Sequence, residues 1–360
     1  MALAAENAGT DMEHRDWRRR MTLPVLAVLL GLSVLASVTI GASDVSLGGA
    51  ARALGDALGF DTGATLRDRV ILFDIRLPRT VLGLLVGASL AISGALMQGL
   101  FRNPLADPAL IGVSAGSSLA AVCVIVLAGS LGITVPVWLA PHLLPLAAFC
   151  GGLVVTFTLY AIATRSGRTS VATMLLAGIA IAALAMALTG YIVFHSDDTQ
   201  LRDFTFWNMG SLGGATWARV AGMLPFVAVL LIAIPFLGNG LNALLLGEAE
   251  AFHMGFAPER LKRAIVVLTA AATGASVAGA GVIGFVGIVV PHVLRLAVGA
   301  DNRLLLPACA LLGASLLLFA DILSRLVVAP AELPIGIITA VLGAPVFLSI
   351  LLRRRSVIDI

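Results

Sequence analysis

Two short glycine-containing motifs have the spacing of known chemical sites. Gly279-Ala-Gly281-Val-Ile-Gly284 has the spacing of a dinucleotide-binding loop, which holds a pyrophosphate between a strand and a helix. Gly112-Val-Ser114-Ala-Gly116 has that of the turn that presents a nucleophilic serine, with His142 or His292 as candidate base. Both motifs lie in largely apolar stretches, where a soluble sheet is not expected. We therefore expect no nucleotide binding and keep an intramembrane serine protease at Ser114 as an alternative.

The remaining reactive side chains argue against ATP hydrolysis and against a metal centre. A P-loop needs a glycine-rich loop directly before its lysine, whereas the single lysine, Lys262, follows Glu-Arg-Leu. Cys123, Cys150 and Cys309 lie far apart in apolar runs, as small buried side chains do. The sequence predicts no catalytic residue, no metal site and no permanently bound cofactor.

The composition identifies the class of protein that must position any functional residue. Hydrophobic residues make up 59% of the 360 residues, 38 more are glycine, and only 12% are charged. A soluble domain of this size exposes too much surface to hide so many apolar side chains. The net charge of +3 is typical of basic loops on one side of a membrane and does not indicate a nucleic-acid partner. We predict an all-α, polytopic transmembrane helix bundle.

Ten apolar stretches are long enough to cross a hydrocarbon core of about 30 Å. They lie at 23–42, 80–100, 109–129, 141–163, 171–193, 217–237, 262–280, 282–298, 304–324 and 334–352. An even number places both termini on one side, and most Arg residues lie in the segments on that side, which predicts cytoplasmic termini. The expected organisation is a cytoplasmic segment over 1–22, a transmembrane domain over 23–352 and a cytoplasmic tail over 353–360.

Charged residues are almost absent from the centres of these stretches. Asp321 and Arg325 are four residues apart near an external helix end, where they can form a local ion pair that Glu332 can join. Because ion-coupled carriers usually keep an acidic residue within the membrane, the pattern argues against an ion-coupled secondary transporter. That class is kept as the alternative function.

One predicted cytoplasmic loop, 238–261, has the pattern of a folded surface element. Residues 249–254 form a short apolar and acidic helix that Gly255 and Pro258 end. Such a helix either docks another protein or lies on the membrane surface, and the residues alone leave both interpretations open.

Five blocks, in order along the chain, resemble the FecCD family of permeases over about residues 20–355. These blocks lie at 76–98, which begins Arg76-Leu-Pro-Arg79, at 103–108, at 110–116, at 284–295 and at 331–347, which begins Ala331-Glu-Leu-Pro334. The resemblance implies a ten-helix permease of an ABC importer in the bacterial inner membrane. It also implies a homodimer, two cytoplasmic ATPase subunits that use ATP and Mg, and a periplasmic substrate-binding protein.

The resemblance assigns roles to three groups of residues. Arg76, Arg79 and Arg325 correspond to external arginines that pair with acids of the binding protein. The family's coupling helix, which seats in the ATPase, corresponds to Glu248, Glu250, Phe252, His253, Met254 and Gly255. The cytoplasmic gate corresponds to Arg168, Thr169, Ser170 and Thr173, although Val171 and Ala172 replace polar residues of the cobalamin branch.

The expected cargo is haem, with a ferric siderophore or cobalamin as alternatives. The segments 204–217 and 241–250 look most like the haem branch. Siderophore members often carry a proline where this chain has Val282. We expect haem to be transported cargo and not a permanently bound cofactor.

Overall fold

The computed structural model describes residues 2–41, 47–60, 62–127, 136 and 139–358, and these residues are mainly helical. The helices of the first half are α1 (Ala2–Thr39), α2 (Leu47–Ala57), α3 (Leu66–Val70), the π-helical η1 (Ile71–Arg76), α4 (Leu77–Leu100), the 3-10 helix η2 (Pro108–Ile111), α5 (Val113–Val122) and the π-helical η3 (Cys123–Leu127). They are followed by α7 (Ala140–Ala163), the strands β1 (Thr164–Arg165) and β2 (Arg168–Thr169), and α8 (Val171–Phe194). The rest comprises α9 (Asp198–Asn208), α10 (Trp217–Leu246), α11 (Glu248–His253), α12 (Pro258–Ala280), α13 (Val286–Val298), α14 (Asn302–Leu326) and α15 (Ile335–Ile358).

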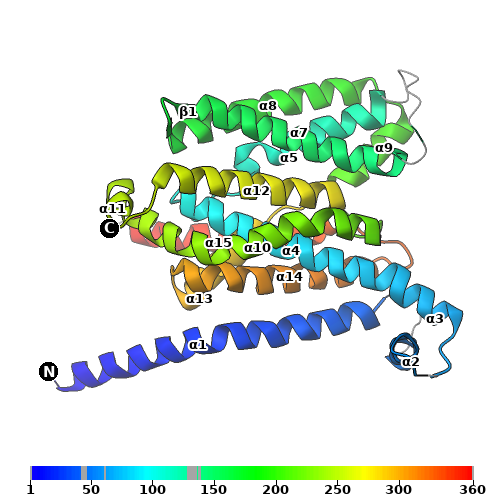
Figure 1. Ribbon diagram of the computed structural model, residues 1–360, viewed down its shortest axis with the longest axis horizontal. Coiled ribbons are helices and arrows are strands. Elements are labelled where there is room, and N and C mark those ends of the chain that lie inside the picture. Colours follow the sequence, from blue (N-terminus) through cyan, green and yellow to red (C-terminus); the bar gives the residue numbers. More distant parts are fainter. Residues whose placement is uncertain (1, 42–46, 61, 128–135, 137–138, 359–360) are drawn as a thin grey trace.

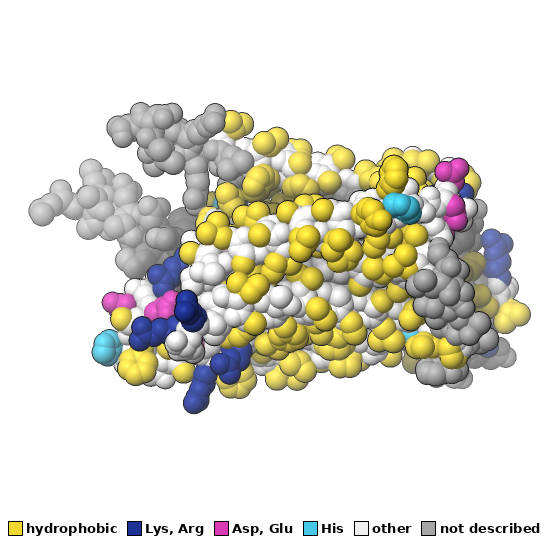
Figure 2. All heavy atoms as spheres, turned by 90° about the horizontal axis from the view of Figure 1, so that it is seen from above, with side chains coloured by type: hydrophobic (Ala, Val, Ile, Leu, Met, Phe, Trp, Pro, Cys, Tyr) yellow, Lys and Arg dark blue, Asp and Glu magenta, His cyan; other side chains and the backbone are white. Residues whose placement is uncertain are grey.

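The long helices run side by side along the longest axis of the molecule (Figure 1). The α11 end is the end that holds α11, β1, the start of α1 and the end of α15 (Figure 1). The α9 end, opposite, holds α2, α3 and α9 (Figure 1). Side chains between the two ends are largely hydrophobic on the face that Figure 2 shows, and charged side chains gather near the ends.

Seven described helices are long and apolar enough to cross a membrane. Three shorter apolar helices, Val113–Leu127, Val286–Val298 and Ile335–Ser349, occupy the positions of the other three predicted stretches. A polytopic helical bundle is thus confirmed, whereas ten crossings and the side of the termini remain predictions. The end of the stretch predicted at 109–129, at 128 and 129, lies outside the described residues, as do residues 1, 359 and 360 of the predicted terminal segments.

Several predicted boundaries are wrong, because the ends of the helices do not coincide with the ends of the apolar stretches. Residues 66–79 of a predicted external loop form one continuous helix with α4 up to Leu100. Residues 238–246 of the predicted cytoplasmic loop belong to α10. Residues 282–285, predicted at the start of a span, are irregular, and Phe285 has a φ of 68°. The strands β1 and β2, of two residues each, also add a small antiparallel hairpin to the predicted all-α fold.

Helix α4 forms the centre of the bundle and packs against α10, α12, α13 and α14. Two contacts are so close that only glycine fits. A Cβ on Gly94 would overlap with the carbonyl oxygen of Gly287 on α13, and one on Gly87 would overlap with that of Gly313 on α14. Lipid provides no hydrophobic driving force for association between helices, so close packing of their backbones stabilises the bundle instead. Glycine at these positions therefore allows α4 to lie close to α13 and α14.

Candidate functional site

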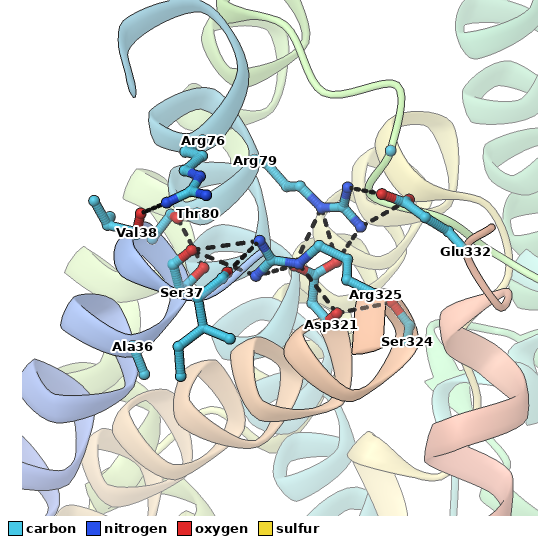
Figure 3. A network of polar contacts seen from close by, with 12 residues as sticks. Ala36, Ser37, Val38, Arg76, Arg79, Thr80, Asp321, Ser324, Arg325 and Glu332 are labelled. Atoms are coloured by element: carbon cyan, nitrogen blue, oxygen red, sulfur yellow. Dashed lines mark hydrogen bonds and ion pairs between the residues drawn. The ribbon is translucent and has the colours of Figure 1, made fainter. Parts of the chain in front are cut away.

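Five charged residues form an arginine cluster at the α9 end: Arg76, Arg79, Asp321, Arg325 and Glu332 (Figure 3). Arg79 lies at its centre. Its guanidinium donates to both carboxylate oxygens of Asp321 at 2.8–3.1 Å and to both of Glu332 at 2.8 and 3.0 Å. A planar guanidinium suits such two-point contacts with carboxylates. The cluster therefore joins α4 to α14 and to the segment before α15, and each of these contacts spans more than 240 residues.

Arg325 and Arg76 satisfy the carbonyl groups at the end of α1. Arg325 pairs with Asp321 at 3.1 Å and donates to the carbonyl of Ile40 at 3.0 Å. Arg76 donates to the carbonyls of Val38 and Thr39 at 2.6 and 2.9 Å (Figure 3). The last carbonyls of a helix lack backbone partners and carry partial negative charge, so cationic side chains stabilise them. The local Asp321–Arg325 pair predicted from the sequence is present, and Glu332 joins it through Arg79.

The burial of this cluster bears on its predicted docking role. Arg76, Arg79 and Arg325 are 3%, 7% and 5% exposed, and Asp321 is 1% exposed. Only the Glu332 side chain, at 37%, is partly open to solvent. Docking of a binding protein through these arginines stays a prediction. In this structure all three are engaged within the chain, so a partner carboxylate would have to compete with internal ones.

The predicted coupling helix is a separate short helix at the α11 end. Ala251 is fully buried against Ala243 and Leu244 of α10, whereas Phe252 and Met254 are 67% and 57% exposed. Glu248, Glu250 and His253 are also exposed. Gly247 and Gly255 flank the helix with φ of 136° and 88°, values that residues with a side chain rarely adopt. The predicted short surface helix, ended by Gly255 and Pro258, is confirmed, and its apolar side chains are available for a partner.

The end of α10, against which α11 packs, is held in place by polar contacts. Asn242 on α10 donates to Asp301 at 2.7 Å and accepts from the backbone of Asn302 at 2.9 Å. Burial would raise the pKa of the Asp301 carboxyl, but hydrogen bonds from Asn242 and the Arg303 amide bring it below its usual value. The charged form of Asp301 is thereby favoured, and it fixes the end of α10 to the start of α14.

The predicted gate residues lie on the hairpin and at the start of α8. Arg168 is exposed, Thr169 is buried, and the Ser170 side chain accepts from the backbone of Thr173 at 3.2 Å. This hydrogen bond satisfies one of the free N–H groups at the start of α8. The gate role itself stays a prediction.

Sequence reasoning missed the lysine cluster, which consists of Lys262, Glu248, Glu259 and Thr169. The Lys262 ammonium lies 2.8 Å from the Glu248 carboxylate and 3.0 Å from that of Glu259, and it donates to the carbonyl of Thr169 at 3.1 Å. Lys262 is 3% exposed. The available signal was the single lysine at the start of an apolar helix, but the sequence does not show its partner from the hairpin.

A cavity of about 600 Å³ lies beside the lysine cluster. It separates the end of α4 and its following loop from the start of α8, and its lining includes Leu100, Asn103, Val171, Leu175, Glu248 and Lys262. The start of α8 therefore has open space on one side.

The two glycine-containing motifs do not have the geometry of chemical sites. Gly279–Gly284 spans the end of α12 and the irregular segment after it, with no strand-to-helix turn. Ser114 lies in the first turn of α5, directly after the 3-10 helix η2. Within the part of the chain that the structure describes, no cluster of His, Cys, Asp and Glu is placed to hold a metal ion.

Comparison with known proteins agrees with the arrangement of these helices. The model of the FecCD transport family matches residues 29–353. The chain belongs to this family. As a FecCD protein it is a multi-pass membrane protein and the permease type of subunit of an ABC importer.

Individual relatives differ in the cargo that their names state. The hemin transport system permease protein HmuU of Yersinia pestis is 43% identical over 94% of this chain and 97% of its own length. The cobalamin import system permease protein BtuC of Halobacterium salinarum is 46% identical over 80% of this chain and 75% of its own length. The vitamin B12 import system permease protein BtuC of Shigella boydii is 42% identical over 92% of this chain and 94% of its own length.

A solved structure supports the fold independently. It is described as an inward-facing conformation of a putative metal-chelate type ABC transporter, and its TM-score is 0.77 at 29% identity. The match covers 92% of this chain and 98% of the other.

Proposed function

We propose that this chain is the permease of an ATP-driven importer that moves haem across the bacterial inner membrane. The observation that carries the proposal is α11, an exposed short helix with apolar side chains, placed between two long helices of a FecCD protein. A soluble ATPase can seat on such a helix, whereas nothing in this chain's sequence resembles a P-loop. The working complex has two copies of this chain and two ATPase subunits.

The proposed orientation places the α11 end in the cytoplasm and the α9 end in the periplasm. Both termini then lie in the cytoplasm, in agreement with the distribution of arginines. The arginine cluster lies at the periplasmic end, where a binding protein delivers its cargo. Arg76, Arg79 and Arg325 contribute to that docking, and Glu332, the exposed acid of the cluster, is the group that a partner carboxylate displaces from Arg79.

Haem is the proposed cargo because a hemin permease aligns over 97% of its own length and 94% of this chain. Cobalamin is the second candidate, because a cobalamin permease of Halobacterium salinarum has slightly higher identity over a shorter alignment. A ferric siderophore is the third candidate cargo for the same type of permease.

Transport by the reconstituted complex tests the proposal. Proteoliposomes would contain this chain and an ATPase subunit, with a haem-binding or a cobalamin-binding protein supplied outside. We expect haem uptake that requires both ATP and the binding protein and that Ser114→Ala leaves unchanged. Uptake driven by a proton or sodium gradient alone would identify a secondary transporter. Uptake of cobalamin but not haem would overturn the cargo and leave the transport class intact.

A further inference from the structure

The lysine cluster joins three elements that the proposed function treats separately. Glu248 begins α11, Glu259 and Lys262 lie in the first turns of α12, and Thr169 ends the hairpin that leads into α8. Transferring an ammonium group out of water is costly unless charged and polar partners compensate. Lys262 meets that requirement with three oxygens, one from each element, so its burial depends on all three staying together.

The hairpin and α11 are attached to the lysine cluster by contacts of different strength. The hairpin is clamped to α12 twice, because the Thr169 carbonyl accepts from Lys262 and the Thr169 N–H donates to Glu259 at 3.0 Å. Helix α11 is attached to this cluster by one ion pair, through the Glu248 side chain, which is 51% exposed. Loss of Glu248 therefore detaches α11 from the cluster and leaves the hairpin clamp in place.

The surroundings allow the hairpin and the start of α8 to move as one unit. The 600 Å³ cavity lies along Val171 and Ala172, directly after the hairpin, and Glu248 and Lys262 lie in its wall. The hairpin is thus tied to the lysine cluster, and the start of α8 that directly follows it borders the cavity. A displacement of α11 or α12 is carried to the start of α8 through these contacts.

We propose that Lys262 is the positioning residue that transmits movement of α11 to the hairpin β1–β2 and the start of α8. The inference rests on the proposed function, in which α11 seats in an ATPase subunit. An ATPase that pulls on α11 pulls on Glu248, and Lys262 passes this displacement to Thr169. The ion pairs of this cluster therefore couple ATP hydrolysis to opening of the transport path.

The test uses the complete complex in proteoliposomes and measures haem uptake per ATP hydrolysed. We expect Lys262→Gln to lower this ratio about tenfold, and Glu248→Gln, whose side chain is half exposed, to lower it about threefold. The ATPase subunit stays bound and active in both variants. Lys262→Arg, which keeps the charge, restores most of the ratio. The matched control is Arg260→Gln, which removes an exposed cation two residues away and leaves the ratio unchanged.

A distance measurement separates coupling from a merely structural role. Spin labels are placed at the exposed positions Ala249 on α11 and Arg165 on β1. Double electron–electron resonance then measures the distance between the two labels. Because the complex holds two copies, labelled chain is diluted with unlabelled chain so that the distance within one copy is measured. We expect this distance to be narrowly distributed in the wild type, with and without nucleotide, and broadly distributed in Glu248→Gln. Because Glu248 is half exposed, this variant keeps its fold even if Lys262→Gln does not.

The outcomes distinguish this inference from the proposed function. If Phe252→Asp releases the ATPase but Glu248→Gln and Lys262→Gln keep wild-type uptake per ATP, the lysine cluster does not transmit the movement and the inference is wrong. If Phe252→Asp leaves the ATPase bound and coupled, α11 is not the docking helix, and both the proposed function and the inference fail.

Discussion

The arginine cluster and the lysine cluster solve the same problem of buried charge in different ways. At the α9 end, three buried arginines share two acids and the carbonyl groups that end α1, so nearly every contact is internal. At the α11 end, one buried lysine holds two partly exposed glutamates, and one of them belongs to an exposed helix. The first arrangement fixes helices to one another. The second connects the bundle to a surface on which another protein can act.

The largest expected effect comes from removing the acid at the centre of the arginine cluster. Asp321→Asn leaves Arg79 and Arg325 buried with one fewer counter-charge, and breaking such a buried pair typically costs about 3–5 kcal/mol. Thermal unfolding in detergent measures the loss. Asp203→Asn, the same substitution at an exposed position of α9, is the control and is expected to change stability by less than about 0.5 kcal/mol. Equal effects would mean that the arginine cluster does not fix the helices.

A smaller loss of stability is expected at the contact between Gly94 of α4 and Gly287 of α13. Gly94→Ala places a methyl group against the carbonyl oxygen of Gly287, and overpacking of this kind typically costs about 1–3 kcal/mol. Gly31→Ala on α1 is the control, because the added methyl group has no atom within 4 Å apart from its chain neighbours and the backbone of its own helix. Thermal unfolding in detergent compares the two variants. If both melt alike, α4 and α13 are less tightly packed than the structure shows.

Glu332→Gln tests whether the arginine cluster also docks a partner. Glu332 is the partly exposed acid of the cluster, so its loss is expected to reduce stability by no more than about 1 kcal/mol. Since Arg79 then has one internal competitor fewer, we expect tighter binding of the cargo-loaded binding protein, measured by titration of the detergent-purified permease. Unchanged or weaker binding would count against exchange of carboxylates at Arg79.

The structure also shows why a simpler test of docking is unsuitable. Reversing the charges of Arg76 and Arg79 would remove two donors to the end of α1 and to Asp321. Loss of transport in that double variant would follow from misfolding as readily as from lost docking. Glu332→Gln avoids this difficulty, because it leaves every buried arginine in place.

The sequence predicted those parts of the structure that depend on local pattern. The apolar stretches, the short helix near 249–254 and the Asp321–Arg325 pair all involve residues a few positions apart, and all are present. The contacts of Arg79 with Asp321 and Glu332 span more than 240 residues, and no local spacing reveals them. The same holds for the Lys262–Thr169 contact, which joins residues 93 positions apart.

The boundary errors have a physical cause of their own. Residues 66–79 contain six charged side chains, so their composition resembles a loop, yet they continue α4 as a helix beyond the bundle. A capping box between Thr65 and Asp68 starts this extension. Capping residues were a better guide to the helix start here than hydropathy was.

The most direct test of the account compares the two ends with one matched substitution. Phe252 on α11 and Phe60 near the α9 end are 67% and 65% exposed, so exchange of either for Asp costs little packing. Each variant would be expressed with the ATPase subunit, purified from membranes and assayed for bound ATPase. The account predicts that Phe252→Asp loses the ATPase and that Phe60→Asp retains it fully. Full retention by Phe252→Asp would contradict the central claim that the α11 end receives the ATPase.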